Sequence, residues 1–278
     1  MMLEVLLFPF QFPFMAKAFT IVLILSPAAA LLSCFLILRG WALIGDAISH
    51  GALPGIVFAY LGGLPLIFGA FASGFTCAVL SGFLAKTGRL KADTVMGVVF
   101  SGMFALGIVI YTKVEASIDL IHILFGNMLG VSTWDIIFSG AISATVVLII
   151  FLKRLDLLLY CFDPVQGHVM GLNTNLLHYG LIIMLSFTVV NALATVGMIL
   201  SIGLLIIPGA TAFIITKHFN KMLLLATLIT LLSGFFGVYV SFFLDSAPEP
   251  TVILLSSLIF LLAMIVKSFR SNKNSKTL

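Results

Sequence analysis

The chain has 278 residues, of which 62% are hydrophobic and only 9% are charged, and its formal net charge at pH 7 is +4. Soluble domains are about half apolar and about a quarter charged, so this composition excludes a water-soluble fold. No basic patch with interleaved aromatic residues marks a nucleic-acid binder. The cysteines Cys34, Cys77 and Cys161 show no CxxC spacing, so neither a disulfide framework nor a zinc ribbon is predicted.

The N-terminal residues 1–15 do not resemble a cleavable signal peptide. Glu4 is followed by an aromatic, proline-broken stretch from Phe8 to Phe14 instead of a smooth apolar core that ends in small residues. We expect this segment to lie at the membrane interface, ahead of the first membrane-spanning helix.

Long apolar runs follow along almost the whole chain, and a helix of roughly 20 residues is enough to cross a bilayer. The predicted spans are residues 18–38, 41–61, 66–84, 94–111, 136–152, 181–194, 197–216, 222–244 and 251–266. The sixth and seventh runs share one uncharged stretch. The prediction is therefore an all-α membrane protein, a polytopic bundle of eight to nine transmembrane helices in a single domain over residues 1–278.

The positions of Lys and Arg orient this bundle, because cytoplasmic loops carry an excess of both. With the N-terminus outside, every Lys and Arg except Lys17 and Lys113 falls on one side, which we assign to the cytoplasm. The outer side collects Glu4, Glu115, Asp119, Asp135, Asp245 and Glu249. This acidic face is either a docking surface for a cation or a delivering protein, or an ordinary charge asymmetry.

Two cytoplasmic segments stand out, the loop 156–178 and the basic tail 268–278. Within the loop, Asp163 followed by Pro164 indicates a helix start, since the carboxylate caps free amides and proline suits the first helical position. Gly171 is suited to end that helix. A short surface helix is therefore expected, either as a contact for a soluble motor subunit or as an ordinary connector.

The second span holds Asp46, the one carboxylate that falls well inside a predicted span. Burying an ionisable group there costs at least a few kcal/mol, so it needs a partner or a function. His50 follows one turn later on the same helical face. A carboxylate and an imidazole form half of a first-row metal site. The alternative is that the two residues only bond each other as a structural pair.

Two spans contain predicted breaks. Pro54 cannot donate to the carbonyl of His50, so a kink is expected there, with Gly45 nearby to permit close packing. Pro208 and Gly209 predict a similar interruption of the seventh run. Such breaks are typical of helices that line transport pathways. A kink that serves packing alone is the alternative for Pro208.

The remaining histidines and the missing motifs narrow the function. His122 falls in the outer segment, while His168, His178 and His218 fall in or beside cytoplasmic loops, where an interfacial role is expected. No G-x-x-x-x-G-K-[ST] phosphate loop occurs, so the chain is not expected to bind ATP in that way. No Ser/His/Asp set or HExxH motif suggests a hydrolase.

Four motifs, GDAISHGALPG, HILFGNMLGVS, DPVQGHVMGL and GLLIIPGATA, together resemble the permeases of the manganese, zinc and iron ABC importers, the metal branch of the ABC-3 family. The resemblance covers nearly the whole chain. It implies a type II ABC importer-like permease in a bacterial plasma or inner membrane, working as a homodimer with two cytoplasmic ATPases and an extracytoplasmic metal-binding protein.

The resemblance also assigns residues. Asp46 and His50 match the family's intramembrane coordination pair, and residues 163–171 match its coupling helix, which seats in a groove of the ATPase. Gly167 departs from the alanine usual in that loop, and His168 adds an imidazole; both bear on the fit to the ATPase. The permease itself would hydrolyse nothing and would hold no permanent cofactor, only the transported ion.

Mixed carboxylate and imidazole ligands suit Mn²⁺ or Fe²⁺, and Zn²⁺ accepts the same pair. GDAISH is closer to the manganese and iron members, which favours those ions. Two other hypotheses stay open at this point. One is a stand-alone ion-coupled secondary metal transporter with Asp46 and His50 as a proton relay, and the other is an intramembrane enzyme or sensor.

Overall fold

The computed structural model describes residues 8–87, 91–114, 126 and 128–275, and over these residues the chain forms helices and no strand. Two are short 3₁₀ helices, η1 (Phe8–Gln11) and η2 (Met128–Gly130). The α-helices are α2 (Pro13–Arg39), α3 (Ile44–Gly51), α4 (Leu53–Leu61), α5 (Leu66–Thr87), α6 (Ala92–Tyr111), α8 (Thr133–Phe162), α9 (Pro164–Val169), α10 (Thr174–Ile215), α11 (Phe219–Phe243) and α12 (Pro248–Ser275). The prediction of an all-α membrane protein is confirmed.

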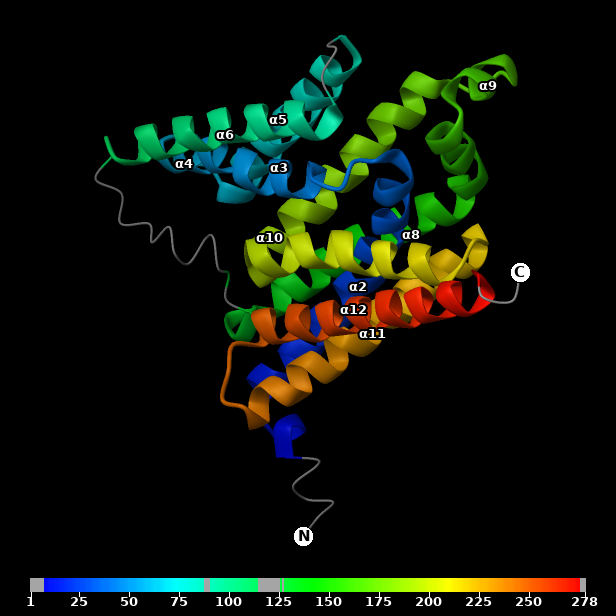
Figure 1. The fold of residues 1–278 in the computed structure, drawn as a ribbon. Helices are drawn as coiled ribbons and strands as arrows, with labels where there is room; N and C mark the ends of the chain where they lie inside the picture. Colours follow the sequence, from blue (N-terminus) through cyan, green and yellow to red (C-terminus); the bar gives the residue numbers. More distant parts are fainter. Residues whose placement is uncertain (1–7, 88–90, 115–125, 127, 276–278) are drawn as a thin grey trace.

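The described residues contain eight helices that are long and apolar enough to cross a membrane, with α3 and α4 counted as one. One of the eight, α10, has 42 residues, and its length of about 63 Å is twice the roughly 30 Å of a bilayer core. Gly197 divides it, with φ 79° and ψ 173°. In Figure 1 the ribbon of α10 reverses direction, so α10 makes two crossings.

In Figure 1, η1 and the start of α2 lie toward the end of the bundle where α11 passes into α12, and the last turns of α12 lie at the other end, as an odd number of crossings requires. The short helix α9 lies at the end where α8 and α10 meet, and the C-terminus lies toward the same end. That end also holds Arg39 in the last turn of α2 and Lys217 just after α10. It is the end that the basic residues assign to the cytoplasm.

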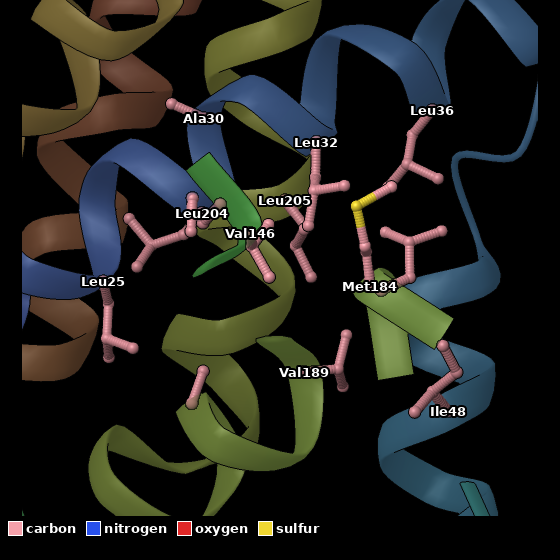
Figure 2. Packing of buried hydrophobic residues seen from close by; sticks show 14 of the residues in the cluster. Leu25, Ala30, Leu32, Leu36, Ile48, Val146, Met184, Val189, Leu204 and Leu205 are labelled. Atoms are coloured by element: carbon pink, nitrogen blue, oxygen red, sulfur yellow. The ribbon is translucent and has the colours of Figure 1, made fainter. Parts of the chain in front are cut away.

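The core of the bundle forms around α2, which packs against α8, α10 and α11. Figure 2 shows Leu36 of α2 beside Met184, which precedes Gly197 in α10, and Leu32, one turn earlier in α2, beside Leu205, which follows Gly197. All four side chains are buried. Lipid tails are as apolar as these residues, so close packing and not exclusion of water holds the helices together.

A second group of helices, α3 to α6, lies along one side of this core (Figure 1). Within this group α3 is the most central, because it packs on α5, α6 and α10. Gly55 of α4 and Gly69 of α5 bring their backbones into direct contact, and a side-chain carbon on either glycine would collide with the other helix. The small residues therefore fix the position of the α3–α4 segment.

The N-terminal segment is described from residue 8 onward. Phe8 and Phe10 of η1 pack on Phe242 and Phe235 of α11, with ring centroids 5.9 and 6.2 Å apart. Helix α2 begins directly afterwards at Pro13. Aromatic rings at the end of a bundle suit the membrane–water interface.

Candidate functional site

The second predicted span forms two short helices, α3 and α4, that meet at Ala52. Most residues of α3 are buried, including Ile44, Ala47 and Ile48. Asp46 and His50 lie on the face that stays partly open. The apolar side chains of α3 therefore pack into the bundle, while Asp46 and His50 face a partly accessible space.

Asp46 and His50 contact each other. The distance from Nε2 of His50 to Oδ1 of Asp46 is 3.3 Å, and their side chains are 21% and 24% exposed, respectively. Two ligands bound to one tetrahedral ion at about 2.1 Å each lie about 3.4 Å apart. The pair is therefore spaced as if it shared one ion, and the partial exposure leaves room for that ion to enter.

Two phenylalanines of α6 hold the imidazole of His50. The ring of Phe100 stacks on it at 5.4 Å between centroids, and the ring of Phe104 meets it edge-on at 4.8 Å. Nδ1 of His50 is enclosed and has no hydrogen-bond partner among the described residues. Sequence reasoning missed both phenylalanines, because they are 50 or more positions away and apolar residues are common in every span.

The described part of the chain contains no cluster of three or more His, Cys, Asp and Glu side chains suited to hold a metal ion. The pair Asp46 and His50 offers two candidate ligands, which is fewer than the four of a structural zinc site. A metal-ligating histidine usually donates its other N–H to a carboxylate or carbonyl, which makes it a stronger ligand. His50 lacks that support here, so the half-site favours weak, reversible binding.

The junction of α3 and α4 follows from Pro54. Since Pro54 cannot donate to the carbonyl of His50, that carbonyl accepts from the N–H of Ala52 instead. The hydroxyl of Ser73 in α5 donates to the carbonyl of Gly51 at 2.6 Å. At the other end of α3, Gly45 packs tightly, because a Cβ there would lie 3.3 Å from the side chain of Leu205.

The predicted interruption at Pro208 and Gly209 was wrong. Helix α10 continues through both residues to Ile215, and the residue with non-helical backbone is Gly197. A proline inside a helix removes one hydrogen bond, and neighbouring helices can offset that loss in a membrane. Gly209 supplies such a contact, since a Cβ there would lie 2.6 Å from the backbone carbonyl of Ser33 in α2.

The segment predicted as a cytoplasmic helix forms α9. The carboxylate of Asp163 accepts hydrogen bonds from the N–H groups of Val165 and Gln166 at 3.0 and 2.9 Å. Pro164 occupies the first helical turn. Both features match a well-formed helix start.

The far end of α9 is equally defined. Gly171 adopts φ 83°, a left-handed conformation that suits glycine after a helix. Gly167 is buried, and a Cβ there would lie 3.6 Å from Thr174 and 3.9 Å from Leu159. The outward side presents two valines, Val165 and Val169, which are 74% and 80% exposed, together with the exposed polar side chains of Gln166 and His168. A solvent-facing helix with exposed valines is suited to bind a partner protein.

Two predictions about other polar residues need correction. His178, expected in a loop, is 2% exposed inside α10 and lies 2.7 Å from the hydroxyl of Tyr160. Glu249, expected on an acidic outer face, is 9% exposed and accepts a hydrogen bond from the N–H of Met128 at 3.0 Å. Each buried group has found a partner, as burial demands. His122, with Glu115 and Asp119, lies outside the described residues.

Comparison with known proteins agrees with these features. The family model of the ABC 3 transport family matches residues 11–267. A Haemophilus influenzae protein, named as a probable iron transport system membrane protein, is 49% identical over 97% of this chain and 99% of its own length. The manganese transport system membrane protein MntB of Synechocystis is 40% identical over 92% of this chain and 84% of its own length.

The fold also matches a solved structure. PsaBC from Streptococcus pneumoniae in complex with Fab contains a chain that aligns with a TM-score of 0.82 at 31% identity, covering 95% of each chain. The family match spans nearly every crossing helix described above. This chain therefore belongs to the ABC 3 transport family and is a multi-pass membrane permease of the ABC transporter type.

Proposed function

We propose that the chain is the permease subunit of an ATP-driven importer for divalent transition-metal ions, with Asp46 and His50 as transient ligands of the ion. Mn²⁺ and Fe²⁺ are the favoured substrates and Zn²⁺ is the remaining candidate. Relatives of this chain are named for iron or manganese transport. The observation that carries the proposal is the 3.3 Å pair of carboxylate and imidazole on a partly open face of a membrane helix.

The proposed assembly is a homodimer with two cytoplasmic ATPases and an extracytoplasmic binding protein. A two-fold axis doubles every ligand, so two copies supply two carboxylates and two imidazoles. Four such groups complete a tetrahedral set for Zn²⁺, and waters complete a larger set for Mn²⁺ or Fe²⁺. The half-site described here, with two ligands in one chain, fits this arrangement.

Transport in this scheme depends on weak binding. An ion that leaves the binding protein exchanges hydration water for Asp46 and His50, and a site that held it too firmly would not release it. Movement of α9 by the ATPase then opens the inner side, which gives alternating access. The enclosed, unpartnered Nδ1 of His50 is consistent with a ligand of modest strength.

The test is metal uptake by cells that carry the whole importer, with Mn²⁺, Fe²⁺ and Zn²⁺ supplied separately. Asp46→Asn keeps the size of the side chain but removes its charge, and His50→Gln removes the imidazole. Ser49→Ala is the matched control, because Ser49 lies between them on α3 and its hydroxyl bonds only the carbonyl of Gly45 in the same helix, at 3.0 Å. Protein abundance in the membrane is measured for each variant.

We expect both ligand variants to lose uptake of the transported metal by at least about tenfold, the scale of effect seen when metal-site contacts are removed. Ser49→Ala should retain uptake. Uptake of all three metals at wild-type rates by Asp46→Asn, at normal abundance, would disprove the ligand role. Uptake that persists when the ATPase is inactivated would instead refute the ATP-driven mechanism.

A further inference from the structure

A group of polar and aromatic side chains lies beneath α9, at the cytoplasmic end of the bundle. Tyr160 lies in the last turn of α8, three residues before the cap residue Asp163. His178 lies in the first turns of α10. The hydroxyl of Tyr160 is 2.7 Å from Nδ1 of His178, and both side chains are 2% exposed. This buried hydrogen bond joins the two helices that carry α9.

Two residues from the end of α2 complete the group. The guanidinium carbon of Arg39 lies 4.7 Å from the ring centroid of Tyr160 and 5.5 Å from that of Trp41. The ring of Trp41 meets His178 edge-on at 5.3 Å. We call Arg39, Trp41, Tyr160 and His178 the coupling joint.

The charged guanidinium of Arg39 contacts these rings and no carboxylate of the described residues. Among the residues that the structure describes, no carboxylate lies within ion-pair distance of Arg39, since the ion pairs there are Asp46 with His50 and Lys153 with Asp156. A cation held between aromatic faces away from water is attracted to both rings. Arg39 is half-buried, so it cannot leave this position without losing both contacts.

The joint leads directly to the candidate metal ligands. Gly40, between Arg39 and Trp41, has φ 70° and ends α2. The chain then passes through Trp41 into α3, and Asp46 lies five residues after Trp41. The N–H of Trp41 donates to the carbonyl of Leu36 in α2 at 2.9 Å, and the carbonyl of Trp41 accepts from the N–H of Ile44 in α3 at 3.1 Å. Displacement of Trp41 is therefore transferred along the chain to α3.

The other end of the joint is equally firm. Asp163 ends α8 and begins α9, and the side chain of Asn173 accepts from the N–H of Leu176 at 3.1 Å to begin α10. Since α9 follows α8 directly at Asp163 and is joined to α10 by a short connection, it cannot tilt without moving the last residues of α8 and the first residues of α10. Those residues include Tyr160 and His178.

We propose that the coupling joint transmits displacement of α9 to α3, so that Arg39, Trp41, Tyr160 and His178 position α3 for its movement and leave the binding of metal by Asp46 and His50 unchanged. This inference rests on the proposed function, because it takes α9 as the contact for the ATPase. A hydrogen bond joins α8 to α10, and the contacts of Arg39 with Tyr160 and of Trp41 with His178 join these two helices to the turn that precedes α3. Coupling between α9 and α3 is demonstrated when a substitution in the joint uncouples ATP hydrolysis from ion movement and leaves each activity intact.

The experiment uses the permease, its ATPases and its binding protein in sealed vesicles. Mn²⁺ uptake and phosphate release are measured together, which gives the number of ions moved per ATP hydrolysed. Tyr160→Phe removes only the hydroxyl that bonds His178, and Arg39→Gln removes the charge. Binding of Mn²⁺ by the detergent-purified permease is measured separately for each variant.

Arg154→Gln is the matched control. Arg154 also lies on the cytoplasmic side, and its guanidinium carbon is 5.2 Å from the ring of Phe151. Its removal costs the same charge and the same type of contact, while the contacts within the coupling joint stay in place. His178→Asn serves as a conservative variant, because its amide places a polar atom near the position of Nδ1.

We expect Tyr160→Phe and Arg39→Gln each to lower the number of ions moved per ATP by roughly tenfold, within the usual range of coupling effects. Binding of Mn²⁺ and ATP hydrolysis should stay within about twofold of wild type in both variants. In Arg154→Gln these two quantities and the number of ions moved per ATP should all stay within about twofold of wild type. His178→Asn should retain more coupling than His178→Leu. A variant that combines Tyr160→Phe and Arg39→Gln should move as many ions per ATP as the poorer of the two single variants, because the effects of residues that act as one unit do not add.

Three results would overturn the inference. Unchanged ion-to-ATP ratios in both Tyr160→Phe and Arg39→Gln would do so, as would an equal loss in Arg154→Gln. A parallel loss of Mn²⁺ binding would show a role in folding instead. Absence of ATP-dependent uptake of Mn²⁺, Fe²⁺ and Zn²⁺ by the wild-type complex would refute the proposed function itself, and the inference would fall with it.

Discussion

Gly209 allows α10 to touch the backbone of α2, and its replacement tests how closely the bundle is packed. A Cβ at Gly209 would lie 2.6 Å from the carbonyl carbon and oxygen of Ser33, whereas ordinary contacts begin at 3.4 Å. Gly209→Ala therefore forces α2 and α10 apart by about 0.8 Å, and overpacking of this kind costs about 1–3 kcal/mol. The atoms in the way belong to backbone and cannot rotate aside.

Gly180 provides the matched control on the same helix. A Cβ at Gly180 would meet nothing within 4 Å. Glycine to alanine in a helix is favourable by about 1 kcal/mol in both positions, so this gain cancels when the two variants are compared. The difference in free energy of unfolding between Gly180→Ala and Gly209→Ala is then the packing cost alone.

The assay is thermal unfolding of the detergent-purified protein. Samples are heated to a series of temperatures, and the height of the monodisperse peak in size-exclusion chromatography measures how much protein stays folded. Each kcal/mol shifts the melting temperature by about 2–4 °C in soluble chains of similar size. We expect Gly209→Ala to melt several degrees below Gly180→Ala. If the two variants melt together, or if Gly209→Ala is the more stable, the helices are not in backbone contact and the packing argument is wrong.

Other substitutions test separate contacts. Glu249→Ala should lower the melting temperature more than Glu249→Gln, because only the former leaves the buried N–H of Met128 without an acceptor, a loss of about 1–3 kcal/mol. Asp163→Ala should weaken copurification of the ATPase, with Asp163→Asn retaining it, since the cap of α9 is worth about 1 kcal/mol. Gly197→Ala should reduce membrane abundance well below that of Gly97→Ala, because φ 79° with ψ 173° is accessible essentially to glycine alone; equal abundance of the two would contradict this.

The membrane-spanning helices could be predicted because lipid imposes their length and composition. The contact between Asp46 and His50 could be predicted because the two residues lie one helical turn apart, and a charged group in hydrocarbon is costly and therefore conspicuous in an apolar span; their ligand role stays a prediction. The cap at Asp163 was readable because it depends on neighbours within three residues. Each of these features is local, so a single sequence carries its signal.

The predicted spans 181–194 and 197–216 divide α10 close to Gly197, but the same signals do not identify the residue that turns the chain. Pro208 attracted attention because it lacks an N–H, yet the helix continues through it, since contact with α2 offsets one lost bond. Gly197 reverses the chain, but 24 glycines occur in the sequence and nothing nearby distinguishes this one. Its role depends on close contact with Gly126, a residue far away in the chain. Tertiary contacts of this type leave no periodic pattern.

Asp46 and His50 lie on a helix of only eight residues, α3, with a turn at each end. Gly40 separates α3 from α2 on the cytoplasmic side, and the Ala52–Pro54 junction separates it from α4. A short helix between two breaks can tilt without unfolding, whereas a continuous span would have to move as a whole. The Ser73 hydroxyl holds the Gly51 carbonyl on the far side, so a tilt would pivot there. If Asp46 and His50 bind the ion as proposed, a tilt of α3 would carry both ligands with it.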